Sequence, residues 1–289
     1  MHASARSRAA EDYRSPKPLG DRLSVLECGS PLPLWIWIAI LALSISATAA
    51  EVRCLPNAHA HNDYLHTRPL LDALDQGFCS VEADIHLVNG KLLVAHDEDK
   101  VDPAKTLESL YLDPIKERFG KNGKPGEFTL MIDVKTDAES TYAVLRETLK
   151  KYSAMLTVFR ADAIEPKAVT VILSGNRAIN TISNEPVRYA GIDGRLPDLE
   201  SKPPRALMPW VSDNWTKTFT WRGEGKMPED ERARLKRLVQ QAHEQGRKIR
   251  FWAIPDDRRG WAELHRAGVD LINTDNLAEL RAFLISENL

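Results

Sequence analysis

No charge of one sign predominates in this sequence, and cysteine is scarce. Lysine and arginine number 39 against 41 aspartates and glutamates, which gives a formal net charge of −2. Because a basic excess is missing, the chain lacks the electrostatic signature of a nucleic-acid-binding protein, and no nucleic acid partner is expected. Three cysteines are too few for a disulfide framework, although Cys54 and Cys79 could either pair or remain buried free thiols.

Glycine-rich phosphate loops, internal repeats and low-complexity linkers are also absent from the sequence. The lack of a glycine-rich fingerprint after an early strand argues against a doubly wound dinucleotide-binding sheet. Long hydrophobic runs are limited to one, at residues 32–45, and this run is shorter than the roughly 20 apolar residues that a membrane-spanning helix needs.

That apolar run has the layout of a secretory signal. Several arginines and lysines precede it, and Ala47-Thr48-Ala49 follows it as a small-residue cleavage site. We predict that residues 1–50 form a signal peptide and that the protein is exported, to the periplasm or outside the cell. An uncleaved membrane anchor formed by residues 32–50 is the alternative, and it would bring membrane association.

Residues 51–289 alternate between strand-like apolar runs and helix-like segments. Strands are predicted at 53–59, 79–87, 91–96, 128–134, 168–173, 187–192, 205–210, 248–254 and 269–274. Helices are predicted at 68–77, 138–151, 228–245, 258–267 and 276–285. This alternation favours a single α/β domain, a (β/α)8 TIM barrel, over an open doubly wound sheet. The second helix is replaced by a tight turn at Asn89-Gly90.

Polar residues share one face of several predicted strands, near the ends where a barrel carries its active site. These residues are His59, His61, Glu82, Asp84, His96, Asp133 and Lys135. Carboxylates inside apolar strands need a partner, because an unpaired buried charge is costly. Glu82, Asp84 and Asp133 would suit a hard divalent cation, Mg²⁺ or Ca²⁺. Histidines beside them suit acid/base catalysis, and Lys135 suits an anion, so together they predict phosphodiester cleavage.

The strongest resemblance lies in the stretch GFCSVEADIHLVNGKLLVAHD, residues 77–97. It resembles the core signature of the glycerophosphodiester phosphodiesterases, within the superfamily that includes phosphatidylinositol-specific phospholipase C. The stretches HNDY, RPLLDAL and TLESLYLDPI resemble the altered-inheritance-of-mitochondria branch of phosphodiesterase-like proteins. The resemblance covers roughly residues 55–275 and implies a TIM barrel that often lacks its second helix.

The resemblance also implies roles for individual residues. It assigns acid/base catalysis to His59 and His96, metal binding to Glu82, Asp84 and Asp133, and substrate binding to Lys135 and Trp252. His61 is the alternative to His59 and otherwise a substrate-binding residue. The His-Arg-Gly motif of the family is absent, because the chain reads His59-Ala60-His61-Asn62-Asp63. Arg68 is a candidate to replace the lost positive charge, and Asp133 stands where most members have glutamate.

The expected substrate is a small-molecule or lipid-derived phosphodiester, and no protein partner is inferred. Two other functions stay open. His59-Ala60-His61 also resembles the His-x-His motif of zinc amidohydrolases and polymerase-histidinol-phosphatase hydrolases, although such sites need further histidines from later strands. The missing arginine leaves room for a non-catalytic, secreted barrel that binds a ligand.

Overall fold

A computed structural model describes residues 54–121 and 123–287. The predicted signal peptide or anchor, residues 1–50, lies outside the described residues. Within the described residues, no helix is long and apolar enough to cross a membrane.

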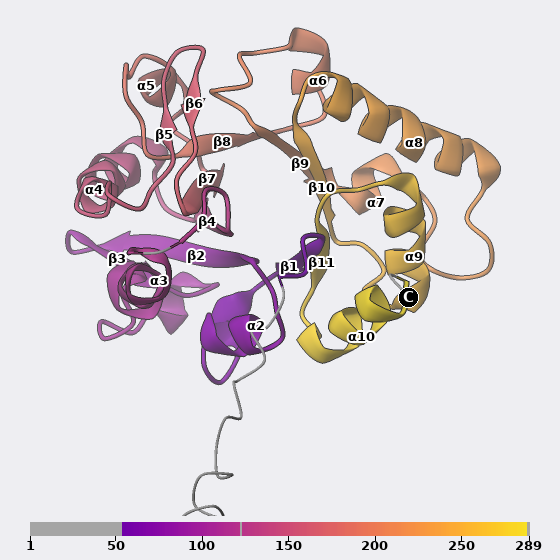
Figure 1. Ribbon diagram of the computed structural model, residues 1–289, viewed down its shortest axis with the longest axis horizontal. Coiled ribbons are helices and arrows are strands. Elements are labelled where there is room, and N and C mark those ends of the chain that lie inside the picture. Colours follow the sequence, from indigo (N-terminus) through magenta and orange to yellow (C-terminus); the bar gives the residue numbers. More distant parts are fainter. Residues whose placement is uncertain (1–53, 122, 288–289) are drawn as a thin grey trace, which may run out of the picture. The chain divides into compact units, whose positions relative to one another are not determined.

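Eight parallel strands of the described chain form a barrel (Figure 1). In order around it they are β1 (Ala58–Ala60), β2 (Ser80–Val88), β4 (Phe128–Val134), β7 (Val169–Gly175), β8 (Gly191–Gly194), β9 (Trp210–Asn214), β10 (Lys248–Trp252) and β11 (Ile272–Thr274). β11 pairs with β1, and a parallel bridge between Arg250 and Leu271 joins β10 to the segment that leads into β11. The predicted TIM barrel is confirmed.

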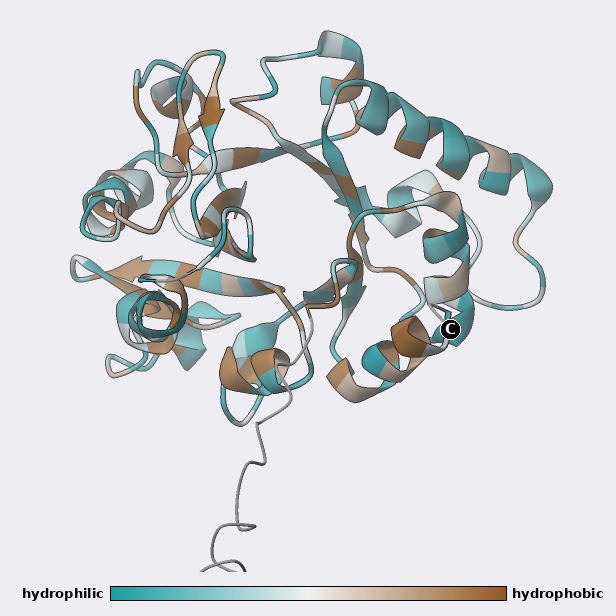
Figure 2. Cartoon of the chain, viewed as in Figure 1, coloured by the Kyte–Doolittle hydropathy of each residue, from teal (hydrophilic) through white to brown (hydrophobic). Residues whose placement is uncertain are grey.

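Helices cover the outside of the ring of strands (Figure 1). The longer ones are α3 (Asp113–Phe119), α4 (Ala138–Lys150), α8 (Glu229–Glu244), α9 (Arg258–Ala267) and α10 (Leu277–Glu287). The shorter ones are α2 (Leu71–Asp75), α5 (Ile179–Ser183), α6 (Asp198–Ser201) and α7 (Trp215–Thr218). α8 is hydrophilic over most of its surface (Figure 2) and buries Leu235, Val239 and Ala242, which lie on one helix face.

The tight turn at Asn89-Gly90 is present, but β3 (Lys91–Val94) runs antiparallel to β2 and is not a barrel strand. The prediction that 91–96 is a further strand of the parallel set is wrong, because the two-residue turn at Asn89-Gly90 can only return the chain antiparallel to β2. The crossover from β2 to β4 still contains a helix, α3, so the hairpin is an addition to that crossover. A second small hairpin, β5 (Val158–Phe159) with β6 (Ile164–Glu165), was not predicted.

The core has two parts because strand side chains alternate between faces. Val81, Ala83 and Ile85 of β2 point outward and belong to the apolar cluster shared with the helices. A small cluster of Met131, Ile172, Trp210 and Leu271 is separate from it. Arg250 reaches across from β10 to Glu82 on β2 and Met131 on β4, so this second layer lies inside the barrel. The polar residues of the alternating pattern therefore face the barrel interior.

A disulfide bond joins Cys54 to Cys79. Cys54 lies upstream of β1 and Cys79 directly precedes β2, and a bridge between Leu55 and Phe78 holds the same two segments together. The pairing that the sequence left open is thus present in the structure, at the end of the barrel where the strands begin.

Candidate active site

A cavity of about 440 Å³ opens where the barrel strands end. Its lining comes from β2, from the carboxyl ends of β4, β7 and β10 and from the segments that follow β1, β3 and β8. The lining residues are His61, Asn62, Glu82, His96, Asp133, Val134, Lys135, Ser174, Gly175, Asn176, Arg195, Arg250 and Trp252. This is the end of a TIM barrel at which active sites are built.

Three carboxylates meet at one side of this cavity. Glu82, Asp84 and Asp133 each offer an oxygen, and these oxygens lie within 4.8 Å of one another. Parallel pairing sets Asp84 of β2 beside Asp133 of β4, while Glu82 lies two residues earlier on the same face of β2. The register of two neighbouring strands therefore builds the cluster, as the alternating pattern predicted.

The cluster carries more negative charge than its surroundings neutralise. Lys135 Nζ lies 2.9 Å from Asp84 Oδ2 and 3.2 Å from Asp133 Oδ2, and Tyr64 donates a hydrogen bond of 2.7 Å to Asp84 Oδ2. Burial and the charge of Glu82 nevertheless raise the pKa of Asp84 to about 6, and they also raise the pKa of Asp133. Holding the carboxylates of Asp84 and Asp133 this close to Glu82 is costly unless a further cation, besides Lys135, binds between them.

The two aspartates also keep free coordination capacity. Asp84 Oδ1 and Asp133 Oδ1 are buried and have no hydrogen-bond partner among the described residues. Buried carboxylate oxygens are normally satisfied, so an unpartnered pair indicates a missing ligand. Oxygen donors from three carboxylates fit Mg²⁺ or Ca²⁺, which prefer such ligands. The residues present fit a divalent cation.

Glu82 differs from the two aspartates because it has its own counter-charge. Arg250 Nη1 donates to Glu82 Oε2 over 2.8 Å, and His59 Nε2 lies 3.3 Å from the same oxygen. Burial alone would raise the pKa of Glu82, but the charge of Arg250 and the contact with His59 together hold that pKa below its usual range. Glu82 is therefore ionised whether or not a cation is present.

Two histidines line the cavity beside the cluster. His61 follows β1, and its Nδ1 lies 2.9 Å from Asp275 Oδ1. His96 follows β3, and its Nδ1 lies 2.9 Å from Asp97 Oδ1. An aspartate on Nδ1 fixes the ring and leaves Nε2 for a proton transfer. Burial alone would lower the pKa of His61, but the hydrogen bond with Asp275 raises it above its usual value.

Comparison with known proteins agrees with this geometry. Residues 46–129 match the family model described as AIM6-like phosphodiesterase domain, and residues 248–278 match the glycerophosphoryl diester phosphodiesterase family. Altered inheritance of mitochondria protein 6 from Saccharomyces cerevisiae is 31% identical over 270 residues, which cover 76% of this chain and 68% of that protein. The chain belongs to the altered inheritance of mitochondria protein 6 family. The Eremothecium gossypii member is 28% identical over 282 residues, covering 81% of this chain and 70% of that one.

Among solved structures, two glycerophosphodiester phosphodiesterases have a fold similar to that of this chain. A glycerophosphodiester phosphodiesterase from Parabacteroides distasonis superposes with a TM-score of 0.54 at 17% identity, over 82% of this chain and all of that one. One from Agrobacterium tumefaciens gives a TM-score of 0.51 at 15% identity, over 79% of this chain and 99% of that one. The barrel is therefore shared with glycerophosphodiester phosphodiesterases, as its sequence motifs indicated.

The structure does not bring His59 to the cavity. Its side chain is 0% exposed, with Nδ1 2.7 Å from Ser80 Oγ and Nε2 2.9 Å from Arg250 Nη1. Burial, helped by the charge of Arg250, lowers the pKa of His59 to about 4, so the ring is neutral near pH 7. His59 supports Glu82 from within the barrel, and His61 instead lies in the cavity, where His59 was predicted.

Arg68 is also displaced from its expected role. It lies outside the cavity, where its guanidinium pairs with Asp72 and Asp75 at 2.7 and 2.6 Å. The arginines of the cavity are instead Arg195 and Arg250, which the sequence analysis missed. Arg250 could have been found, because it shares a strand face with Trp252. Arg195 lies beyond β8 in a segment that carries no recognisable strand pattern.

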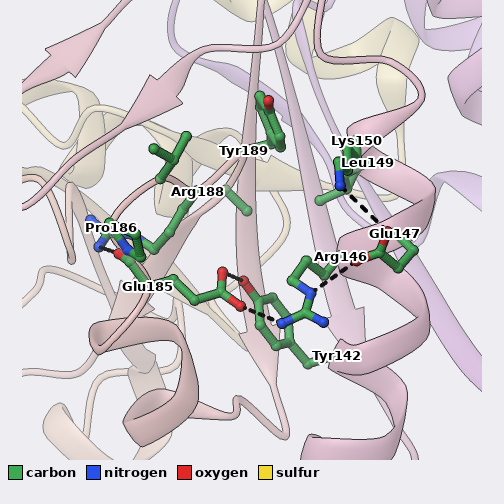
Figure 3. A pocket seen from close by; sticks show the side chains of 11 residues that line it. Tyr142, Arg146, Glu147, Leu149, Lys150, Glu185, Pro186, Arg188 and Tyr189 are labelled. Carbon is green, nitrogen blue, oxygen red and sulfur yellow. Dashed lines mark hydrogen bonds and ion pairs between the residues drawn. The ribbon is translucent and has the colours of Figure 1, made fainter.

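A second cavity, of about 340 Å³, lies between α4 and residues 185–190 (Figure 3). Its charged side chains form ion pairs with one another, so they are not free to bind a ligand. Glu185 accepts hydrogen bonds from Tyr142 over 2.7 Å and from Arg146 over 3.0 Å. It lacks clustered carboxylates and histidines among its described lining residues, so the chemistry belongs to the cavity at the strand ends.

Proposed function

We propose that the protein is a divalent-metal-dependent phosphoric diester hydrolase. The observation that carries the proposal is one cavity lined by a three-carboxylate cluster and two histidines, each oriented by an aspartate. The family model and the shared fold support the same reaction class.

Glu82, Asp84 and Asp133 would hold the cation, and Lys135 would stay beside them as a counter-charge for the phosphate. When bound, the cation supplies Lewis acidity and neutralises charge on phosphate oxygens. One of His61 and His96 takes the proton of the attacking hydroxyl, from a neighbouring substrate group or from water. The other gives a proton to the leaving alcohol. Asp275 and Asp97 keep both rings in the required tautomer.

The test is a metal add-back assay on the purified protein. After chelation, we expect Mg²⁺ or Ca²⁺ to restore hydrolysis of a glycerophosphodiester, and both Glu82→Gln and Asp133→Asn to abolish the rescue. Asp133→Asn is included because Glu82→Gln also unpairs Arg250 and could unfold the barrel. Glu279→Gln, an exposed position on α10, is the matched control that should respond like the unaltered protein.

A zinc hydrolase built on both histidines of the His-x-His motif would need His59 at the cavity, and its burial argues against that alternative. Rescue by Zn²⁺ alone, with Glu82→Gln and Asp133→Asn unimpaired, would overturn the three-carboxylate site. No turnover with any metal or diester would favour a ligand-binding barrel instead.

We also propose that the protein is exported. The apolar run at 32–45 and the small residues at 47–49 support a signal peptide. The Cys54–Cys79 disulfide supports the same conclusion, because disulfides persist in oxidising compartments. Fractionation of cells that produce the chain, followed by N-terminal sequencing, tests this. A cytosolic protein that retains residues 1–50 would contradict it.

A further inference from the structure

We propose that the cavity contains a second anion-binding subsite centred on Arg195, and that the substrate is a phosphodiester in which one alcohol carries an additional negative charge. The inference rests on the proposed hydrolase function, because it names the substrate class of that site.

The cavity divides into two halves with different chemistry. The half formed by β1 to β4 carries the carboxylates and both histidines, where the phosphorus atom would lie. The half formed by β7, β8 and β10 carries Ser174, Gly175, Asn176, Arg195 and Trp252. A diester bound at the carboxylates would direct one of its two alcohols over this second half. Its side chains therefore select what that alcohol contains.

Arg195 is held in place but not saturated. Its Nη1 donates to Asp193 Oδ2 over 3.0 Å and to Gly194 O over 2.8 Å, and its Nη2 donates to Ser174 Oγ over 3.3 Å. Its Nε has no hydrogen-bond partner among the described residues, and 25% of the side chain is exposed. A guanidinium fixed in this way offers preorganised donors to a carboxylate or phosphate.

The same arrangement disfavours a cationic alcohol such as choline. Among the described lining residues, Trp252 supplies the one large aromatic face, and the Arg195 guanidinium carbon lies 5.1 Å from its ring centroid. The ring is therefore already engaged by a cation and is not free for a quaternary ammonium group.

No carboxylate is available in this half to compensate such a group. The carboxylates of the described lining are Glu82 and Asp133, both in the other half. Asp193 lies beneath Arg195, is 0% exposed, and already accepts hydrogen bonds from Ser174, Ser212 and Arg195. An anionic alcohol would meet an available donor, whereas a cationic one would meet the guanidinium of Arg195 with no carboxylate beside it among the described lining residues of this half.

The experiment measures binding by isothermal titration calorimetry, with Mg²⁺ present. The probes are four non-hydrolysable phosphonate analogues of glycerol diesters whose second alcohol ends in a carboxylate, a phosphate monoester, a tert-butyl group or a trimethylammonium group. Of the carboxylate and phosphate monoester probes, we expect the one with the higher affinity to bind roughly 10- to 100-fold more tightly than the tert-butyl probe. The trimethylammonium probe should bind most weakly. Comparison of the two anionic probes shows which anion the subsite prefers.

Arg195→Gln should bring the anionic probes within about threefold of the tert-butyl probe, whereas Arg195→Lys should retain part of the preference because it keeps the charge. Arg195→Lys also guards against unfolding, since it leaves Asp193 a counter-charge. Arg237→Gln, an exposed arginine on α8, is the matched control and should keep the full preference.

Equal affinity for the anionic and tert-butyl probes, an unchanged preference in Arg195→Gln, or no binding of any probe would each overturn the subsite. The proposed function fails separately. Selective binding by a protein that hydrolyses none of the corresponding diesters would keep the subsite and refute the hydrolase. Hydrolysis with no dependence on charge would do the opposite.

Discussion

His59 and His61 lie only two positions apart in the chain, yet one is fully buried and the other lines the cavity. His59 is paired in register with Asn273 of β11 and lies inside the barrel, while His61 follows the last residue of β1 and reaches the cavity. Alternation along a strand predicts the face of a side chain but not its depth along the barrel. The pattern therefore identified both histidines as inward-facing and could not distinguish the internal one from the one at the rim.

This difference predicts separable effects of the two histidines. His61→Ala should lower kcat roughly 10²- to 10⁴-fold, because it removes an acid/base group, while leaving thermal stability nearly unchanged. His59→Ala should instead destabilise the fold by about 2–4 kcal/mol, because it opens a buried space and removes a hydrogen-bond partner from Ser80 and from Glu82, which keeps its ion pair with Arg250. Steady-state kinetics and thermal denaturation of both variants check this. Full activity in a well-folded His61→Ala protein would assign the chemistry elsewhere.

Asp275 predicts a pH effect of known sign. Its hydrogen bond with His61 favours the protonated ring and raises the pKa of His61. Asp275→Asn removes that preference, so the pKa of His61 should fall. The limb of the kcat/KM profile that reports His61 should then move to lower pH. Asp275→Glu, which keeps the charge, should lie closer to the unaltered protein. A limb that stays in place, or moves to higher pH, would show that Asp275 does not tune His61.

The elements that the sequence predicted best are those whose apolar pattern is complete. β4 coincides with the predicted 128–134 segment, and α4, α8 and α9 fall within a residue or two of expectation. β8 and β9 were placed about four residues too early, at 187–192 and 205–210. Their inward positions carry Asp193 and Ser212, which bond to each other over 2.6 Å, so an apolar-run criterion skipped the true strands.

The same limitation explains which parts of the site were found. The carboxylate cluster depends on one strand pair, β2 with β4, whose alternation is legible in the sequence. Arg195, Arg250 and Asp275 come from other parts of the chain and meet the cluster only after the barrel closes. Arg68 is close in sequence to the motif that lacks its arginine, but proximity along the chain does not imply proximity in a barrel.

Gly175, at the end of β7, packs directly against Asp133 and Val134 of the neighbouring strand β4. It has a φ of +66°, and a Cβ added there would lie 1.9 Å from Asp133 Oδ1 and 2.4 Å from the carbonyl oxygen of Val134. Only glycine fits both the left-handed conformation and the space beside Asp133. Gly225 has a similar φ of +61°, but a Cβ there would meet nothing within 4 Å.

The pair provides a matched prediction. Gly225→Ala should cost about 1 kcal/mol, the penalty for a left-handed alanine. Gly175→Ala should cost more and should weaken the affinity for Mg²⁺, because Asp133 must move. Thermal denaturation and Mg²⁺ titration of the two variants decide the matter. Equal loss of stability and unchanged Mg²⁺ affinity in Gly175→Ala would show that Asp133 is not held by this contact.

At the scale of the whole molecule, the disulfide bond and the candidate active site lie at opposite ends of the barrel. The cavity lies where the strands end, and the Cys54–Cys79 disulfide lies where β1 and β2 begin. The two cysteines are 25 residues apart in sequence. Closing a loop of this size stabilises a fold by about 3 kcal/mol in the chain-entropy account.

We expect the Cys54→Ala, Cys79→Ala double variant to unfold roughly 6–12 °C below the unaltered protein, on the scaling for domains of this size. Its kcat should be unchanged, since neither cysteine lines the cavity. Scanning calorimetry with and without reductant measures this, and the double variant should be insensitive to reductant. A matching loss of kcat at temperatures where the variant is folded would show that the two ends are coupled.

The β2–β3 hairpin has a consequence for how this site can change. Glu82 and Asp84 lie on its first strand, and the antiparallel register, with Ala95 N donating to Asp84 O over 3.2 Å, folds His96 back beside them. The metal-binding candidates Glu82 and Asp84 and the proton-transfer candidate His96 therefore all belong to one hairpin segment of fifteen consecutive residues, 82–96. A one-residue slip at Asn89-Gly90 would turn His96 to the other face, whereas Glu82 and Asp84 would keep the facing that their pairing with β4 sets. A change of length at this turn is therefore expected to remove the proton-transfer candidate from the site while the metal-binding pair on β2 stays in place.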